Sequence, residues 1–254
     1  MFEEERLQLM SEYVQNNTRA TVQELCTLFG VSESTIRRDL KELEKRNLIK
    51  RTHGGAVNID FVSFEPSYNE KTDKHSTEKE LIAKKAAELI EDGDSIIIDA
   101  GTTTFYLAAE LSKFKNLTVV TNSITLAQQL ANIKDINIVT IGGMLRKNTM
   151  AVVGPIAEES LNSIRVDKAF IGTNAIDISA GLTTPNMLEA SIKQKMISVA
   201  NKVYILADNS KFERVSFAKF GKLSDIDACI TGDNLPESIK RDFQSKNIKL
   251  YLVK

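Results

Sequence analysis

The sequence predicts an α/β protein of two domains, an N-terminal winged helix-turn-helix and a larger C-terminal domain with a mostly parallel sheet. Its 254 residues suffice for one small domain and one of ordinary size. The first 58 residues show helical periodicity and then a hairpin, whereas apolar runs alternate with amphipathic stretches further along the chain. Apolar residues make up 42% and charged residues 26% of the chain, which is typical of soluble proteins with a substantial core.

The first two helices are indicated by apolar periodicity and by a capping box. Apolar side chains recur at helical spacing over residues 6–16. Thr21 and Glu24 have the spacing of a capping box, in which each side chain bonds the other residue's backbone N–H at a helix start. A short second helix therefore begins here, and Gly30 turns the chain after it.

A third helix and a hairpin complete the first domain. Ser32 is a good N-cap, and Ile36, Leu40 and Leu43 form one apolar stripe behind it. Residues 48–52 have the composition of a short strand, and residues 53–55 suit a hairpin tip. We therefore assign residues 1–58 to the winged helix-turn-helix.

Residues 59–76 lack clear periodicity and contain Pro66, so we interpret them as a linker. Thr77 and Glu80 have the spacing of a second capping box, which predicts a helix reaching about Ile90. Residues 77–254 form the second domain. Its apolar runs lack the alternation of half-exposed strands, which favours a parallel sheet covered on both faces. The predicted strands are residues 95–99, 117–121, 137–141, 168–172, 203–207, 228–231 and 249–253.

The basic residues of the first domain gather on its third helix and hairpin. In a helix-turn-helix the second helix of the motif enters the major groove of double-stranded DNA, and its first turns contact base edges. An isolated basic helix is more often simply a solvated surface. Here, however, the chain contains in order a capped helix, a glycine turn, a capped basic helix and a basic hairpin, and this order favours DNA binding. The predicted DNA-binding residues are Ser32, Ser34, Thr35, Arg37, Arg38, Lys41, Arg51, Thr52 and His53.

Two segments of this domain carry a family resemblance. They are Val31-Ser32-Glu33-Ser34-Thr35-Ile36-Arg37-Arg38-Asp39-Leu40 with Leu43-Glu44, and Arg51-Thr52-His53-Gly54-Gly55-Ala56. They closely resemble the DNA-binding signature of the DeoR family of bacterial regulators. The resemblance implies that the protein regulates transcription.

Small and hydroxyl-bearing residues follow five of the predicted strands. Ligands of open α/β sheets bind at the carboxyl ends of the strands, and small residues let a phosphate approach the backbone. Small residues at a single strand end usually serve only to form a turn, whereas five such groups at one edge of the sheet predict a binding site. Cations for a phosphate would come from Arg146, Lys193 and Lys211, and acceptors for sugar hydroxyls from Asp99, Asn174 and Asp208. The full predicted effector set is Asp99, Gly101, Thr102, Thr103, Thr104, Asn122, Gly143, Arg146, Asn174, Lys193, Asp208 and Lys211.

The second domain is also similar to the sensor domain of the DeoR family. The matching segments are residues 99–104, 120–123, 142–146, 153–155, 167–174, 181–189 and 206–212. The resemblance implies a fold like that of ribose phosphate isomerases and CoA transferases. It also implies a repressor of a sugar-catabolic operon that a phosphorylated sugar releases from DNA. Similarity to fructose-operon repressors favours fructose 1-phosphate, followed by tagatose 6-phosphate.

Catalysis and activation of transcription are the alternatives. The isomerases carry several acidic residues where this chain has Ile171 to Ala175, so we expect no enzyme activity. We also expect no cofactor and no metal site, because His53 and His75 have no second ligand nearby in sequence. Cys26 and Cys229 are expected to be buried thiols.

Location and assembly follow from simpler observations. No apolar run is long enough to span a membrane, and the acidic start is unlike a signal peptide, so we expect a cytoplasmic protein without membrane contact. Helix-turn-helix domains bind paired half-sites as dimers. We therefore expect a homodimer or homotetramer assembled through the second domain.

Overall fold

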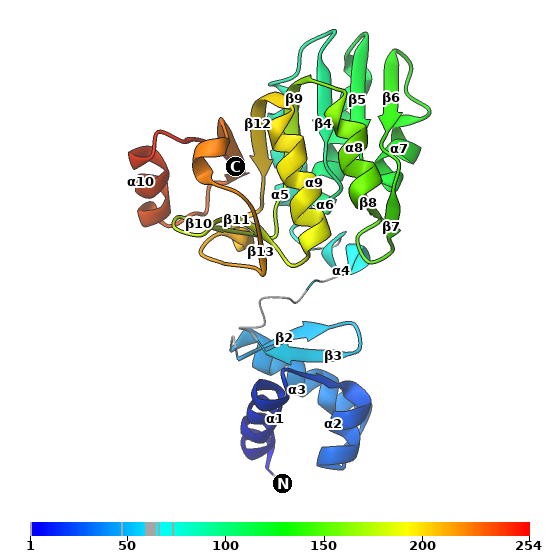
Figure 1. The fold of residues 1–254 in the computed structure, drawn as a ribbon. Coiled ribbons are helices and arrows are strands. Elements are labelled where there is room, and N and C mark those ends of the chain that lie inside the picture. Colours follow the sequence, from blue (N-terminus) through cyan, green and yellow to red (C-terminus); the bar gives the residue numbers. More distant parts are fainter. Residues whose placement is uncertain (1, 47, 59–64, 66, 73) are drawn as a thin grey trace. The chain divides into compact units, whose positions relative to one another are not determined.

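A computed structural model describes residues 2–46, 48–58, 65, 67–72 and 74–254. The chain divides into two compact units, residues 1–66 and residues 67–254, each with its own core (Figure 1). The sequence prediction placed the second domain ten residues later, from residue 77. The difference arises because residues 67–76 pack with the second unit.

The first unit is a winged helix-turn-helix, as predicted. Its elements are α1 (Glu3–Asn17), β1 (Arg19–Thr21), α2 (Val22–Phe29), α3 (Glu33–Lys45), β2 (Ile49–Thr52) and β3 (Gly55–Asn58). The Thr21 capping box forms at the start of α2, and the Ser32 hydroxyl accepts a hydrogen bond from the Thr35 N–H at the start of α3. Gly30 ends α2 with a φ of +64°, a conformation that favours glycine.

The wing contains a strand that the sequence did not reveal. The three strands form an antiparallel sheet in the order β1-β3-β2. The backbone of β1 passes so close to Gly55 that a Cβ there would lie 2.0 Å from the Ala20 carbonyl oxygen. A residue larger than glycine would therefore push the first strand of the wing away from the hairpin.

A buried ion pair joins α1 to α3 inside the first unit. The Arg6 Nε atom donates to Asp39 Oδ2 at 2.6 Å, and both side chains are almost fully buried. The second Asp39 oxygen, Oδ1, is buried without a hydrogen bond among the described residues. The pair lies beside the apolar core formed by α1, α2, α3 and the wing.

The second unit is built on a parallel sheet of seven strands, and all seven correspond to predicted strands. Every adjacent pair is parallel, in the order β15-β14-β12-β9-β4-β5-β6. The strands are β4 (Ser95–Ile98), β5 (Leu117–Thr121), β6 (Ile136–Thr140), β9 (Val166–Gly172), β12 (Ala200–Leu206), β14 (Ala228–Gly232) and β15 (Lys249–Val253). Because the strands are parallel, their carboxyl ends meet at one edge.

Helices cover both faces of this sheet, which explains its continuous apolar runs. Ile96 and Ile98 face one layer, whereas Ile97 faces the other. The first layer contains α5 (Ser76–Ala87), the 3-10 helix η1 (Tyr106–Lys113) and α7 (Ile124–Leu130). The second contains α8 (Pro155–Asn162), α9 (Met187–Ser198) and α10 (Glu237–Ser245), seen in front of or beside the sheet in Figure 1.

Shorter elements complete the second unit. They are α4 (Tyr68–Thr72), α6 (Thr102–Phe105), the hairpin β7 (Met144–Arg146) and β8 (Ala151–Val153), the 3-10 helices η2 (Asn209–Lys211) and η3 (Leu223–Asp225), and the small sheet of β10 (Ala175–Asp177), β11 (Gly181–Thr184) and β13 (Ala218–Gly221). None of the helices in the described part of the chain has the length and apolar character that a membrane span requires.

Two sequence predictions near the start of this unit are wrong. The predicted linker contains α4, whose Tyr68 N–H donates to the Asn148 carbonyl at 2.8 Å, so this segment belongs to the second unit. The predicted capping box at Thr77 does not form; α5 begins at Ser76, and its N-cap, His75, makes no side-chain capping bond. The Glu78 carboxylate instead accepts hydrogen bonds from the N–H groups of Asn209 and Gly232.

Candidate functional site

The polar face of α3 carries most of the predicted DNA-binding residues. Arg37, Arg38 and Lys41 point away from the core stripe and are exposed, with 67% of the Arg38 side chain accessible. Arg37 is held along the helix by two hydrogen bonds to Glu33, at 2.8 and 2.5 Å. Arg38 makes a long ion pair of 3.9 Å with Asp39, so its guanidinium can reach a groove with little competition.

The start of α3 presents a cluster of hydroxyls. Ser32 Oγ lies 2.9 Å from Ser34 Oγ and 2.9 Å from Thr35 Oγ1, and the three residues are exposed or half-buried. Hydroxyls and free N–H groups at a helix start suit a phosphate of the DNA backbone. The capping geometry therefore also fixes the polar groups at the start of α3, where the sequence predicts contact with DNA.

The wing supplies the remaining predicted DNA-binding residues. Arg51 extends from β2, where its backbone N–H donates to Glu44 Oε1 at 3.0 Å and its guanidinium lies 3.8 Å from Glu44 Oε2. Thr52 is half-buried beside it, and His53 is exposed at the turn between β2 and β3. Glu44 thus holds the base of the wing against α3.

The centre of the carboxyl edge in the second unit is a buried ion pair. Asp99 lies directly after β4, and its Oδ2 atom accepts a hydrogen bond from the ammonium of Lys193 on α9. The same oxygen accepts a hydrogen bond from the Gly172 N–H at 3.1 Å. Lys193 donates further to the Gly172 carbonyl at 2.9 Å. Burial raises the pKa of the Asp99 carboxyl, and the ammonium opposes that shift. The pair therefore joins β4, β9 and α9 at the place where the sequence predicted a ligand.

The loop after β4 is shaped by hydrogen bonds to its own backbone. Thr104 donates to the Asp99 and Gly101 carbonyls at 2.7 and 3.0 Å, so its hydroxyl is engaged within the loop. Thr102 and Thr103 begin α6 and are buried. This helix has one turn and continues as the 3-10 helix η1.

Asn122, Asn174 and Gly143 occupy three further strand ends. The Asn122 side chain accepts the Ala100 N–H at 2.7 Å and donates to the Val152 carbonyl at 3.3 Å, which connects the loop after β4 to β8. Asn174 Oδ1 accepts the Thr184 hydroxyl at 3.0 Å. Gly143 is exposed just before β7. Asn122 thus positions the loop that surrounds the Asp99–Lys193 pair.

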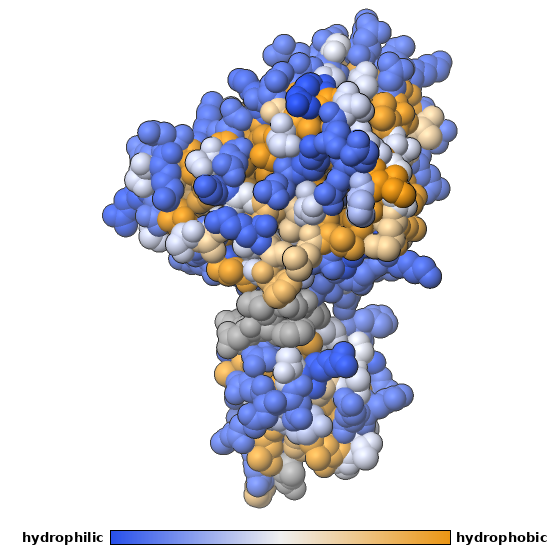
Figure 2. Space-filling model, in the orientation of Figure 1, coloured by the Kyte–Doolittle hydropathy of each residue, from blue (hydrophilic) through white to orange (hydrophobic). Residues whose placement is uncertain are grey.

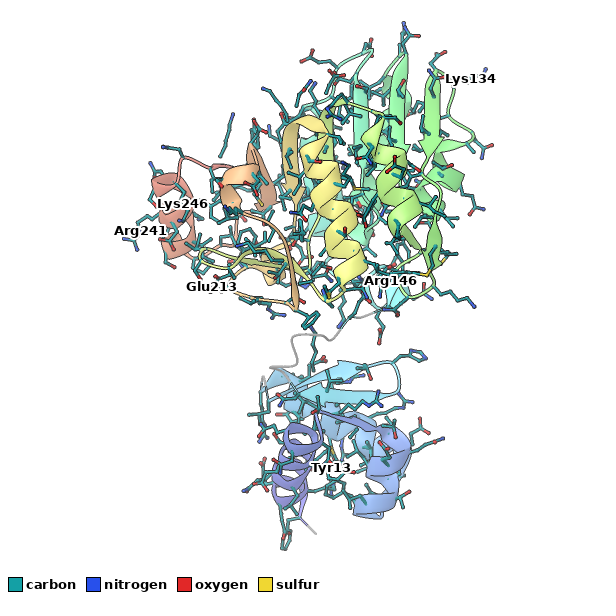
Figure 3. The ribbon with its side chains drawn as sticks, viewed as in Figure 1. Tyr13, Lys134, Arg146, Glu213, Arg241 and Lys246 are labelled. Carbon is teal, nitrogen blue, oxygen red and sulfur yellow. The ribbon has the colours of Figure 1, made fainter. Side chains whose placement is uncertain are left out.

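Arg146 is engaged by a residue to which the sequence gave no firm role. Its Nη1 atom lies 2.5 Å from Glu189 Oε1, and the Thr149 hydroxyl donates to the same oxygen at 2.5 Å. Glu189 lies one turn before Lys193 on α9 and is buried. Figure 3 labels Arg146 at the end of the second unit where α4 lies. The cation proposed for a phosphate is therefore already paired with a carboxylate.

Asp208 and Lys211 form the other end of the edge. Asp208 follows β12 and is fully buried. Its Oδ1 atom accepts hydrogen bonds from the Ser210 N–H, at 3.1 Å, and from the Ser210 hydroxyl. Its Oδ2 atom has no hydrogen bond among the described residues. Lys211 Nζ lies 3.5 Å from Oδ2. Burial raises the pKa of Asp208, but the charge of Lys211 and the Ser210 bond, with smaller contributions from His75 and Lys79, outweigh burial and lower it. Asp208 Oδ2 is thus paired with the Lys211 ammonium but accepts no hydrogen bond from the described residues.

The structure also brings His75 and Glu78 to this place, which the sequence analysis did not foresee. Ligand atoms of His75, Glu78 and Asp208 lie within 4.8 Å of one another, although His75 was interpreted as a linker residue without a nearby partner. The sequence analysis missed this group because Asp208, at the end of β12, lies far along the chain from His75 and Glu78. The Lys211 ammonium already supplies a positive charge to this carboxylate group.

Comparisons with known proteins agree with this arrangement. Residues 6–61 match the family model described as DeoR-like helix-turn-helix domain, and residues 74–233 match the model described as DeoR C terminal sensor domain. The uncharacterized HTH-type transcriptional regulator FruR of Bacillus subtilis (strain 168) is 40% identical over 98% of this chain and 98% of its own length. GlpR, an HTH-type transcriptional regulator of Haloferax volcanii, is 40% identical over 98% of this chain and 97% of its own. GlcR, an HTH-type transcriptional repressor of Bacillus subtilis (strain 168), is 39% identical over 97% and 95%.

Solved structures resemble this chain more distantly than the relatives in sequence do. A ribose 5-phosphate isomerase with bound phospho-erythronic acid covers 53% of this chain and 52% of its own, with 19% identity and a TM-score of 0.40. The translation initiation factor eIF-2B of Pyrococcus horikoshii OT3 covers 85% and 82%, with 15% identity and a TM-score of 0.43. The relatives in sequence, by contrast, are named as transcriptional regulators, in agreement with the prediction of a regulator without enzyme activity. The chain belongs to the DeoR family of transcriptional regulators, with a DeoR-like helix-turn-helix followed by a DeoR C-terminal sensor domain.

Proposed function

We propose that the protein is a repressor of a sugar-catabolic operon, bound to double-stranded operator DNA through α3 and the wing, and released when a phosphorylated sugar binds the second unit. Fructose 1-phosphate is the first candidate effector, followed by tagatose 6-phosphate. The observation that carries the proposal is the carboxyl edge of the seven-stranded sheet, where a buried oxygen of Asp208 accepts no hydrogen bond from the part of the chain that the structure describes. Such an oxygen costs about 1–3 kcal/mol until a donor reaches it, and a sugar hydroxyl is a suitable donor.

The charges at this edge suit a ligand with both hydroxyls and a phosphate. Lys193, Lys211 and Arg146 lie at the edge, each paired with a carboxylate. A phosphate binds an arginine through two parallel hydrogen bonds and competes for it with a carboxylate. We therefore assign the phosphate to the Arg146 side of the edge and the hydroxyls to the Asp208 side.

Self-association through the second unit completes the proposal. A helix-turn-helix reads paired half-sites as a symmetric dimer, and a two-fold interface must be complementary to itself. Figure 2 shows hydrophobic residues gathered around β6, β7 and α8, where Val139, Met144, Leu145 and Ile156 are exposed. An apolar surface is complementary to its own copy, and β6 is an edge strand of the sheet. These features support a homodimer or a homotetramer formed through this surface.

A titration of labelled DNA tests the proposed function. Promoter DNA from the protein's own gene neighbourhood is titrated with protein at fixed salt, and fluorescence anisotropy reports binding. Fructose 1-phosphate, tagatose 6-phosphate and their unphosphorylated sugars are then added. We expect one phosphorylated sugar to weaken binding by about 5–150-fold, and its unphosphorylated form to have no effect. Tight DNA binding that no sugar phosphate alters would contradict the sensor half of the proposal.

The prediction for the DNA-binding half concerns Arg38. We expect Arg38→Ala to weaken operator binding by about 5–150-fold, because an exposed arginine in the first turns of the recognition helix contributes about 1–3 kcal/mol when it contacts a guanine. Lys45→Ala is the matched control, since it removes an equally exposed positive charge from the last turn of the same helix. Equal losses in the two variants would mean that Arg38 contributes general charge and reads no base.

A further inference from the structure

The short helix α4 contacts three parts of the carboxyl edge. The Tyr68 N–H donates to the Asn148 carbonyl in the turn between β7 and β8 at 2.8 Å. The Tyr68 ring packs edge-on against Phe105, the last residue of α6, with 6.3 Å between ring centroids. The Lys71 carbonyl accepts the Lys79 ammonium of α5 at 2.5 Å. The first helix of the second unit is thus fastened to the loops that surround the proposed effector site.

The turn between β7 and β8 is the most direct of these connections. Arg146 and Thr149 at its two ends both bond Glu189 Oε1, so one carboxylate oxygen of α9 holds the turn in place. Asn148, between them, accepts the bond from α4. Met150 in the same turn has a φ of +55°, a strained backbone conformation for a residue other than glycine. The turn is therefore held by its contacts against some local strain.

We propose that this turn and α4 transmit effector binding to the start of the linker. The inference rests on the proposed function, because it needs a phosphorylated ligand at the edge. A phosphate that takes Arg146 from Glu189 removes one of the two bonds that Glu189 Oε1 accepts from the turn. The turn then relaxes, and the Asn148 carbonyl moves away from the Tyr68 N–H. Since α4 begins at the second residue of the second unit, its displacement moves the point at which the chain enters this unit.

The space around α4 allows this movement. A hollow of about 570 Å³ is lined by residues of α4, α6 and α7. It is lined by Tyr68, Asn69, Thr72, Phe105, Thr125, Gln128 and Gln129. Side chains that border an open hollow can shift without the overlaps that a close-packed interior would cause. A rearrangement of α4 therefore leaves the sheet and its main core undisturbed.

The test removes a single hydrogen-bond donor. Ser67 caps α4 through the Glu70 N–H, so Tyr68 is the first helical residue, where proline is tolerated. Tyr68→Pro removes the N–H that reaches Asn148, whereas Tyr68→Ala, the matched control, removes the ring and keeps the N–H. Operator affinity is measured by anisotropy with and without the ketose phosphate that releases the wild-type protein most strongly, chosen from fructose 1-phosphate, fructose 6-phosphate and tagatose 6-phosphate. The coupling is the ratio of the two dissociation constants.

We expect Tyr68→Pro to reduce the coupling to about twofold or less, from the usual range of about 5–150-fold. Tyr68→Ala retains a coupling close to that of the wild-type protein, because it keeps the N–H that reaches Asn148. Full coupling in Tyr68→Pro, or equal couplings in the two variants, would overturn the inference and leave the proposed function intact. A wild-type protein that no ketose phosphate releases would overturn both.

Hydrogen exchange gives a second readout that needs no variant. Amide exchange in the peptide of residues 67–72 is followed in the wild-type protein with and without the same ketose phosphate. Loss of the Tyr68–Asn148 bond predicts faster exchange on ligand binding. Unchanged or slower exchange in this peptide, with ligand bound, would overturn the inference.

Discussion

Lys193→Met destabilises the second unit by about 3–5 kcal/mol at pH 8, because it leaves the Asp99 carboxylate buried without its counter-charge. Methionine keeps the length and apolar part of the lysine side chain, so the change removes mainly the ammonium. The free energy of unfolding is measured in urea for the wild type and the variant. A loss below about 1 kcal/mol would mean that water or another cation reaches Asp99.

The same substitution predicts a particular pH dependence. Without Lys193, burial raises the pKa of Asp99 further above its unfolded value of about 3.9. The folded variant then binds a proton more tightly than the unfolded chain, so its stability decreases as pH rises from the unfolded pKa to the folded pKa. The loss relative to the wild type is therefore smaller at pH 5 than at pH 8. Lys195→Met, two residues further along α9, serves as the control and shows no such pH dependence.

Arg6→Met destabilises the first unit by about 3 kcal/mol, because it leaves the Asp39 carboxylate buried between α1 and α3 with only its long ion pair to Arg38. We place the loss at the lower end of the usual range, since Arg38 Nε still lies 3.9 Å from this carboxylate. A domain of about 60 residues is marginally stable, so this loss unfolds a measurable fraction of it at 37 °C. Operator affinity and protease resistance of residues 1–66 are measured together at 25 and 37 °C.

Two further variants show whether the effect belongs to the buried pair. In Arg46→Met the lost ion pairs, to Glu4 and Glu42, are exposed, so stability changes little. Arg6→Met combined with Asp39→Leu removes both charges and recovers most of the stability. If the double variant were as unstable as Arg6→Met alone, the loss would come from packing of the arginine chain and not from an unpaired charge.

The long buried strands could be predicted from the sequence because their physics is local. Runs such as Ile96 to Ile98 are apolar throughout, and a strand covered on both faces needs this composition. The two caps at Thr21 and Ser32 also depend on residues within one helical turn. By contrast, β1, β7, β8 and β10 have three residues each, too few for any periodicity to be recognised.

The side-chain pairs of the candidate site could not be predicted, because they depend on distant parts of the chain. Residue types at the strand ends indicated where polar groups gather, but Arg146 and its partner Glu189 are 43 residues apart. The predicted capping box at Thr77 was wrong because the structure at the start of α5 also depends on distant parts of the chain. Glu78, one position away, bonds backbone groups 131 and 154 residues further along, and helix α5 begins at Ser76.

The hydrogen bond from Gly232 to Glu78 joins residues that are synthesised far apart in time. Ribosomes add about 5–20 residues per second, so about 8–30 seconds separate the synthesis of Glu78 from that of Gly232, 154 residues later. The first unit has its own core and leaves the ribosome during this interval. Each newly made chain therefore acquires its DNA-reading surface while its sensing edge is still unfinished, and regulation by a ligand begins only after translation has passed β14.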